Sequence, residues 1–365
     1  MATPITTEES RVLKEKKKLV RRSTPDRSQL VRRVVQGLFA ALNCWIGVQF
    51  YLWVRYFERG GTGLYVSRPA AVDGWMPIAG LMNSKYFFDT GHILQIHPAA
   101  MFLFLAFVLM SILLKKAFCG WLCPVGTLSE YLWKLGKRLF GRNLRLPQWL
   151  DISLRGLKYL LLAFFVSAIL AMSAETLRAF AYTSFGIIAG VKMLNFFRYM
   201  SVSAAIVLIL LVFGSLLVRN FWCRFLCPYG ALMGLVSLIS PVKIRRDAGS
   251  CIDCAKCARA CPASLPVDRL VQIRSAECMA CMECVAVCPA ENALQFALPP
   301  RRAASSADRW FRRSLGPAAV AGVLACIFFG LVLFAKATNH WQTNLPRDVY
   351  MRLVTQARDV THPGI

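Results

Sequence analysis

Residues 251–289 read CIDCAKCARACPASLPVDRLVQIRSAECMACMECVAVCP and hold eight of the 14 cysteines of the chain. They form the motif Cys-x2-Cys-x2-Cys-x3-Cys-Pro twice, at Cys251, Cys254, Cys257 and Cys261 and at Cys278, Cys281, Cys284 and Cys288. In this spacing the first three cysteines of a copy wrap one iron–sulfur cubane and the fourth binds the other cluster. We therefore predict two [4Fe-4S] clusters, one held by Cys251, Cys254, Cys257 and Cys288 and the other by Cys278, Cys281, Cys284 and Cys261.

Two other uses of closely spaced cysteines fit this segment less well. A zinc site uses two separated pairs of ligands for each ion, and disulfides are disfavoured in the reducing cytoplasm, where the charge pattern below places the segment. Residues 241–299 are polar compared with their surroundings, and we predict that they form a small α+β ferredoxin module.

Outside this module the chain is strongly apolar, with 56% hydrophobic residues and a mean hydropathy of +0.48. Five uncharged runs approach the roughly 20 residues that a helix needs to cross a bilayer core. These runs cover residues 34–54, 98–114, 159–174, 199–218 and 314–335. We predict an all-α integral membrane bundle of five transmembrane helices, with the ferredoxin module inserted between the fourth and the fifth.

The net charge of +25, from 44 Lys+Arg against 19 Asp+Glu, follows the ends of these runs. Arg32, Arg33, Lys115 and Lys116 fall on the same predicted side, which indicates the cytoplasm and argues against nucleic-acid binding. We expect a multi-pass protein of the bacterial inner (cytoplasmic) membrane. Its predicted parts are a basic cytoplasmic tail that touches anionic membrane lipid (1–33), a four-helix membrane domain (34–240), the cytoplasmic module (241–299), a basic linker (300–313), a fifth helix (314–335) and a periplasmic tail (336–365).

A second cysteine motif, Cys-x3-Cys-Pro, also occurs twice, at Cys119 and Cys123 and, 104 residues later, at Cys223 and Cys227. Each copy follows an apolar run that crosses the membrane in the same predicted direction, which indicates an internal parallel repeat with four thiols at the cytoplasmic surface. Proline suits the first turn of a helix, so we expect Cys123 and Cys227 at helix N-termini, where the pKa of a thiol is lowered.

Three interpretations of these four cysteines remain open. They could be the ligands of a third iron–sulfur cluster, a redox-active thiol site, or small apolar residues in helix packing. Cys44 and Cys326 stand alone in apolar runs and are interpreted as packing residues.

The four histidines all fall on the predicted outer side, and the sequence holds no Cys-x2-Cys-His. This placement argues against a ladder of haems across the membrane. His92 and His97, near Asp89, are interpreted either as a site that binds a quinone head group or takes up its protons, or as interfacial residues.

With both cysteine motifs in this order, residues 30–335 resemble the membrane polyferredoxins. These include the ferredoxin-type membrane subunit of periplasmic nitrate reductase systems (NapH type) and the iron–sulfur membrane half of the nitrous-oxide reductase maturation protein (NosR type). The resemblance implies electron transfer between the quinone pool and a periplasmic or membrane-bound redox partner, such as a reductase or its maturation system, as one subunit of a quinol-linked oxidoreductase. The chain has no counterpart of the NosR-type flavin domain, and it adds a fifth helix to the NapH-type pattern.

A third relative, the ferredoxin-like protein associated with copper-oxidase assembly, shares the same motifs. This resemblance implies an alternative function, in which the clusters supply electrons to a metal-reducing assembly factor for a copper or other metalloenzyme.

Overall fold

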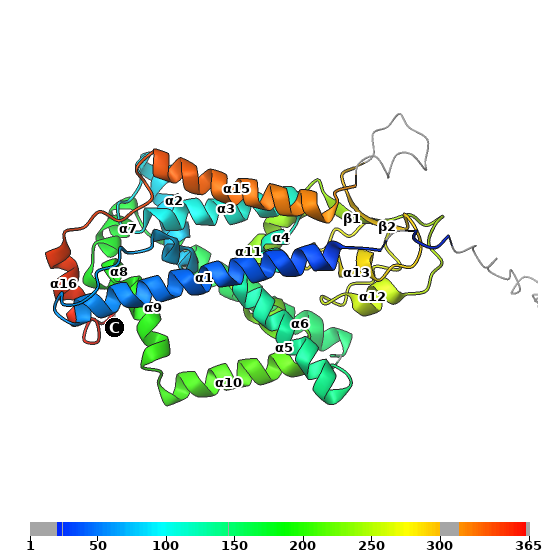
Figure 1. The fold of residues 1–365 in the computed structure, drawn as a ribbon, viewed down its shortest axis with the longest axis horizontal. Helices are drawn as coiled ribbons and strands as arrows, with labels where there is room; N and C mark the ends of the chain where they lie inside the picture. The colour runs from blue at the N-terminus through cyan, green and yellow to red at the C-terminus, as the bar shows by residue number, and fades with distance from the viewer. Residues whose placement is uncertain (1–19, 24, 145, 300–313, 363–365) are drawn as a thin grey trace, which may run out of the picture.

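The computed structural model describes residues 20–23, 25–144, 146–299 and 314–362. The chain is mainly helical, and its long helices lead away from a small module at one end of the molecule (Figure 1). The longer helices are α1 (Ser28–Glu58), α2 (Pro77–Thr90), α3 (Pro98–Leu114), α5 (Pro124–Phe140), α6 (Gln148–Ala171), α10 (Val202–Leu217) and α15 (Pro317–Ala337). The shorter elements before the module are η2 (Ala70–Trp75), α4 (Ala117–Trp121), α7 (Ala174–Ala181), α8 (Ser184–Ile187), α9 (Ala189–Arg198), η3 (Trp222–Leu226), α11 (Pro228–Val236) and η4 (Ser237–Ile239), and α16 (Arg347–Thr355) lies near the C-terminus.

Three of the described helices are long and apolar enough to cross a membrane, namely α1, α6 from Trp149 onward and α15. Helices α9 and α10 form a fourth candidate span only as a pair, because the chain bends by 81° between them. Helix α3 is apolar but has only 17 residues. The protein is therefore a membrane protein, and the fourth and fifth spans stay predictions.

The bend lies inside the fourth predicted run, residues 199–218. Helix α9 ends at Arg198 and α10 begins at Val202. Between them, the Ser201 hydroxyl accepts a hydrogen bond from the backbone N–H of Ala204 at 3.2 Å. A serine in this position caps the start of a new helix, so α10 is shorter than the apolar run that contains it.

Helix α3 forms the centre of the bundle, in contact with α2, α11 and α15. Most of its side chains are buried, and Phe107 stacks on Phe118 of α4 at a centroid distance of 3.9 Å. A helix that is apolar on every face is expected in the interior.

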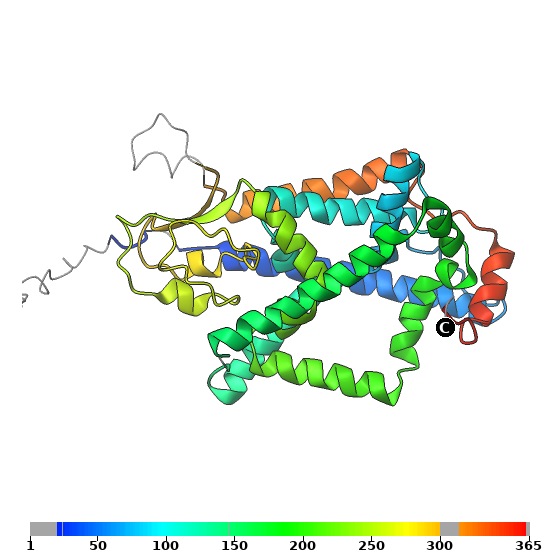
Figure 2. The same ribbon diagram turned by 180° about the vertical axis from the view of Figure 1, so that it is seen from behind.

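The predicted repeat has the same local order of elements in both copies. An apolar helix (α3 or α10) leads into a short helical turn (α4 or η3) and then into a helix that begins at a proline (α5 or α11). The contacts are reciprocal, since α3 packs on α11 and α10 packs on α5. The surroundings differ, because α10 lies at the edge of the molecule (Figure 2), and the internal repeat stays a prediction.

The module is a small α+β unit. Strands β1 (Lys243–Arg246) and β2 (Leu294–Ala297) pair antiparallel, with Lys243 opposite Ala297, and helices α12 (Lys256–Ala260) and α13 (Glu283–Ala286) lie between them in sequence. The described part of the predicted basic tail lies against this module, since Arg22 N–H donates to the Pro289 carbonyl at 3.1 Å. Residues 1–19 and 300–313, including the whole predicted basic linker, lie outside the described residues.

At the opposite end of the molecule from the module, α16 packs on the C-terminal part of α1 (Figure 1). The rings of Trp53 and Tyr350 meet edge to face at 5.0 Å between centroids. The predicted periplasmic tail is thus partly held by this chain itself.

Candidate electron-transfer site

The eight cysteines of the module divide into two sets, each around a small cavity. One set is Cys261, Cys278, Cys281 and Cys284. The other is Cys251, Cys254, Cys257 and Cys288. The fourth cysteine of each motif therefore lies with the first three of the other motif, the exchange that the spacing predicts. Among the described residues, no three His, Cys, Asp or Glu side chains converge as ligands of one metal ion, whereas a cubane presents a separate iron to each thiol, so the donor sets fit [4Fe-4S] clusters.

Both cysteine loops have the same backbone shape. Asp253 and Ala255 in the first loop, and Ala280 and Met282 in the second, adopt the left-handed conformation, with φ between 50° and 57°. These turns wrap each loop around its cavity and place the third cysteine in the first turn of α12 or α13. The fourth cysteine of the first motif, Cys261, follows the end of α12 in an extended conformation, because a residue before proline is disfavoured in a helix.

Burial sets the protonation of the metal-free thiols. It raises the pKa of Cys257 to about 11 and that of Cys281 to about 12, because a thiolate loses its hydration there. Arg32 lowers the pKa of Cys281, but by less than burial raises it. Iron must therefore displace protons from these thiols as a cluster assembles.

The four cysteines of the membrane domain come together at one end of a single large cavity, which Lys116 also lines. These are Cys119, Cys123, Cys223 and Cys227. Cys123 and Cys227 precede α5 and α11 as predicted, and the Cys227 Sγ accepts a hydrogen bond from Gly230 N–H at 3.2 Å.

The prediction of a lowered pKa is wrong for Cys123. Burial raises its pKa to about 11, and hydrogen bonds from the backbone N–H groups at the start of α5 only reduce this effect. Burial likewise raises the pKa of Cys119 to about 12. The loss of hydration outweighs the helix terminus because the thiols lie in an apolar cavity. Four thiolates can exist here only with compensating positive charge, such as bound iron.

Lys116 lines the cavity beside the four thiols, whereas the sequence analysis used it only for the membrane orientation. Burial lowers the pKa of its ammonium group, but Cys119, Glu277 and the other nearby thiols together raise it by more, so the net pKa lies above the usual value. The second copy of the motif has Asn220 at the corresponding position. A charged residue three residues before the first cysteine occurs in only one of the two copies, and this difference is the sequence signal that could have identified Lys116.

The thiol cavity lies directly beside a cluster loop of the module. Trp121 of α4 donates from Nε1 to the Ala280 carbonyl at 3.0 Å, and the Lys115 ammonium donates to the Ser275 carbonyl at 3.1 Å. On another side, the Lys158 ammonium of α6 forms a buried ion pair with Glu277, with N–O distances of 2.6 and 2.7 Å. The membrane thiols therefore lie next to the loop that carries Cys278 and Cys281.

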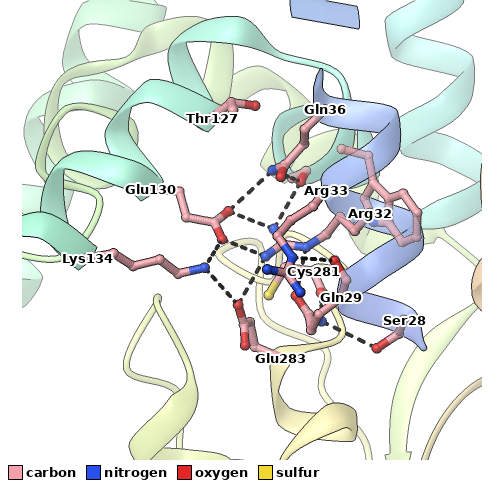
Figure 3. Close-up of polar contacts among 12 residues, drawn as sticks. Ser28, Gln29, Arg32, Arg33, Gln36, Thr127, Glu130, Lys134, Cys281 and Glu283 are labelled. Carbon is pink, nitrogen blue, oxygen red and sulfur yellow. Dashed lines mark hydrogen bonds and ion pairs between the residues drawn. The ribbon is translucent and has the colours of Figure 1, made fainter. Parts of the chain in front are cut away.

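A buried polar network joins α1, α5 and the same cluster loop (Figure 3). The Arg32 guanidinium forms a bidentate pair with Glu130 at 2.6 and 2.7 Å and reaches Glu283 at 3.1 Å. Lys134 contacts both carboxylates, and Gln29 donates to the Cys281 carbonyl at 2.9 Å. Arg32 is only 1% exposed. The sequence placed it at the membrane surface, but the structure buries it between α1, α5 and the loop that carries Cys281.

The two histidines of the predicted quinone site lie in different surroundings in the structure. His97 is buried, and its Nδ1 and Nε2 lie 3.1 Å from Asp73 and 2.9 Å from the Gly186 carbonyl. Burial favours a raised pKa for Asp73, but Arg68 and His97 outweigh it, so the pKa lies below its usual range. His92 is exposed, and Asp89 pairs with Lys85. With both ring nitrogens engaged, His97 stabilises the interior of the protein.

Cys44 and Cys326 do not pack in the interior as expected. Both are exposed, on the outer faces of α1 and α15. An apolar side chain on a membrane helix can face lipid as well as protein, and the sequence pattern is the same in both cases.

Comparison with known proteins adds two family models. One, a 4Fe-4S binding domain, matches residues 96–143 and again 200–247, the two segments with the Cys-x3-Cys-Pro motifs. The other, a 4Fe-4S dicluster domain, matches residues 243–289. No solved structure matches the chain.

Among curated proteins, YccM of Escherichia coli, whose name proposes a role in electron transport, is 47% identical over 334 residues, 91% of each chain. The ferredoxin-type protein NapH of Haemophilus influenzae is 28% identical over 42% of this chain and 49% of its own length. The regulatory protein NosR of Pseudomonas aeruginosa is 31% identical over 44% of this chain and 22% of its own length. The cysteine sets, the candidate membrane helices and the match to YccM over nearly the whole chain lead to one conclusion: the chain belongs to the family of membrane-bound ferredoxin-type proteins that act in electron transport.

Proposed function

We propose that the protein exchanges electrons between the quinone pool and a redox partner through three centres in series. The module would hold one [4Fe-4S] cluster on Cys251, Cys254, Cys257 and Cys288 and a second on Cys278, Cys281, Cys284 and Cys261. Cys119, Cys123, Cys223 and Cys227 would hold a third iron–sulfur cluster. The observation that carries this proposal is the contact between α4, with Cys119, and the loop that bears Cys278 and Cys281.

In this proposal five spans, α1, α3, α6, the bent pair α9 and α10, and α15, place the module in the cytoplasm and α16 in the periplasm. The basic residues near the module end of the membrane helices support this orientation. Oxidation of one quinol releases two electrons and two protons, and each bound cubane takes up one electron at a time. The periplasmic reductase or maturation system that the family resemblance implies would be the partner.

The test is anaerobic iron counting with EPR. We expect about twelve irons per chain in the wild type and about eight in the double variant Cys119→Ser/Cys223→Ser, because a [4Fe-4S] cluster holds four irons. The matched control is Cys44→Ser/Cys326→Ser, which removes two exposed thiols outside the cavity and should keep all irons. A wild type with only about eight irons would remove the third cluster from the proposal, and iron-free folded protein would refute it entirely.

The four thiols of the membrane cavity also support a second candidate function. Thiolate ligands select Cu(I) and iron–sulfur clusters, so the cavity could receive copper that the module clusters reduce, as in the metal-reducing assembly factor. Purified protein that reduces Cu(II) and leaves its clusters unchanged with quinol or quinone would favour this function over exchange with the quinone pool.

A further inference from the structure

The membrane domain contains a cavity of about 590 Å³ that extends from the four thiols between α1, α2, α3 and α6. Its walls are almost entirely apolar, with Phe39 and Ile46 on α1, Leu81 on α2 and Phe165 and Val166 on α6. This volume is within the range of pockets that enclose a small organic molecule. A cluster on the thiols would fill only the cysteine end, so most of the cavity is free to take another molecule.

The side of the cavity is open at membrane depth. Leu42, Trp75 and Ile78 line it and are themselves 36–45% exposed. The polar atoms nearby are satisfied, since Trp75 Nε1 donates to Asn43 at 3.0 Å. A molecule entering here must therefore come from the lipid and carry a long apolar part.

Lys116 provides the specific polar group at the inner end. It is only 2% exposed and lines the cavity. Among the described residues, no side chain or carbonyl accepts a hydrogen bond from its ammonium group or forms an ion pair with it within bonding distance. A buried ammonium gains from a hydrogen-bond acceptor, and an oxygen atom of a ligand in the cavity would supply one beside the thiols.

We propose that this cavity binds the ring of a lipid-soluble quinone, with one ring carbonyl oxygen accepting a hydrogen bond from Lys116 beside the four thiols and the isoprenoid chain leaving past Leu42 and Ile78. The quinone class follows from the shape and chemistry of the site: an apolar body, a hydrogen-bond acceptor at one end, and a redox centre next to that end. This inference rests on the proposed function and moves the quinone site from His92 and His97 to Lys116.

The test uses a photoreactive azidoquinone and a matched pair of substitutions on α6. Val166→Trp fills the cavity, whereas Phe164→Trp adds a similar side chain at a position that is 65% exposed and does not line it. We expect labelled peptides from residues 39–46 and 161–169 in the wild type and in Phe164→Trp, and at least about tenfold less labelling in Val166→Trp. Quinol-driven reduction of the clusters should slow by a similar factor, while dithionite still reduces them fully.

Two further variants keep the test decisive if Val166→Trp fails to fold. Ala71→Leu fills the cavity from η2. Lys116→Met removes the hydrogen-bond donor and keeps an unbranched side chain of similar length. In Lys116→Met we expect that about tenfold more quinol is needed for a half-maximal rate of cluster reduction. Equal labelling and equal rates in the filled variants and Phe164→Trp would overturn the location and leave the proposed function intact. If wild-type clusters exchange no electrons with quinol or quinone, the quinone part of the proposed function fails, whatever the variants do.

Discussion

A Cβ atom added to Gly120 would lie 2.5 Å from the carbonyl oxygen of Met279, closer than a real Cβ atom can approach it. Gly120 follows Cys119, and Met279 follows Cys278. The membrane thiols and a cluster loop therefore meet where no side chain separates them. Glycine permits this approach of two backbones because it has no Cβ.

The substitution Gly120→Ala should push the module away from the membrane domain. We expect a loss of stability of about 1–3 kcal/mol, as in other overpacked interiors, and slower electron exchange between the cluster on Cys278 and the membrane thiols. Thermal unfolding in detergent and freeze-quench EPR measure the two effects. Gly37→Ala on α1 is the control, since nothing lies within 4 Å of its added Cβ. Equal behaviour of the two variants would contradict the role of this contact.

Replacing Arg32 by Gln should lower the reduction potential of the cluster beside it. A nearby positive charge stabilises the reduced, more negative cluster, and among the described residues Glu130 and Glu283 would keep only Lys134 as a cation. We expect a fall of about 59 mV, a tenfold change in the ratio of reduced to oxidised cluster. A redox titration followed by EPR measures it.

The adjacent Arg33→Gln is the control, because Arg33 is exposed and donates only to the Gln29 carbonyl among described residues. Arg32→Lys keeps the charge and should restore most of the potential. A shift of the same size in Arg33→Gln would show that Arg32 has no specific effect.

The pair Lys158 and Glu277 should behave as a buried ion pair in a double-mutant cycle. Lys158→Met alone removes the cation that hydrogen-bonds the buried Glu277 carboxylate, although Lys116 still acts on this carboxylate electrostatically, and should cost up to about 3–5 kcal/mol of stability. The double variant Lys158→Met/Glu277→Gln removes both charges and should recover most of this loss. Thermal unfolding of the wild type, Lys158→Met, Glu277→Gln and the double variant gives the coupling, and simple additivity would argue against the pair.

Substitution of His97 should affect stability more than electron transfer. His97→Gln breaks the contacts with Asp73 and Gly186, so we expect a loss of about 1–3 kcal/mol and an unchanged amount of quinol for half-maximal cluster reduction. His92→Gln should change neither, because His92 is exposed. A selective rise in the quinol requirement in His97→Gln would return the quinone site to the outer side.

Reconstitution of the metal-free protein with iron and sulfide should become more favourable as the pH rises. The pKa values of Cys257 and Cys281 are raised to about 11 and 12, so these ligands are protonated at neutral pH and release protons when iron binds. Higher pH therefore favours the clusters over the thiols. Cluster absorbance at equilibrium, followed from about pH 7 to about pH 10, measures the effect. Exposed thiols, with a pKa of about 8.5, would stop contributing near pH 9, so a plateau above that pH would show that the thiols are not buried in the metal-free state.

The motifs of the chain predicted the chemistry of its centres because ligand spacing is a local property. Cys251, Cys254 and Cys257 lie on one loop, and the proline after Cys261 ends the helix that positions this fourth ligand. The same logic placed Cys123 and Cys227 before helices that begin with proline. Apolar runs likewise indicated membrane helices, although the chain divides the fourth run at Ser201, where a side chain caps a new helix.

Burial and partners over long sequence distances depend on the tertiary structure. In the sequence, Arg32 and Lys116 look like ordinary basic residues at helix ends. Only the packing of α1, α5 and the cluster loop makes Arg32 a buried ion-pair partner and places Lys116 on the wall of a cavity. The pKa of Cys123 is raised although it lies at a helix N-terminus, since hydration is lost through contacts made by several helices together. Hydrophobic periodicity cannot distinguish a face toward lipid from a face toward a cavity, because both are apolar, and so the candidate quinone cavity emerges only when α1, α2, α3 and α6 are assembled.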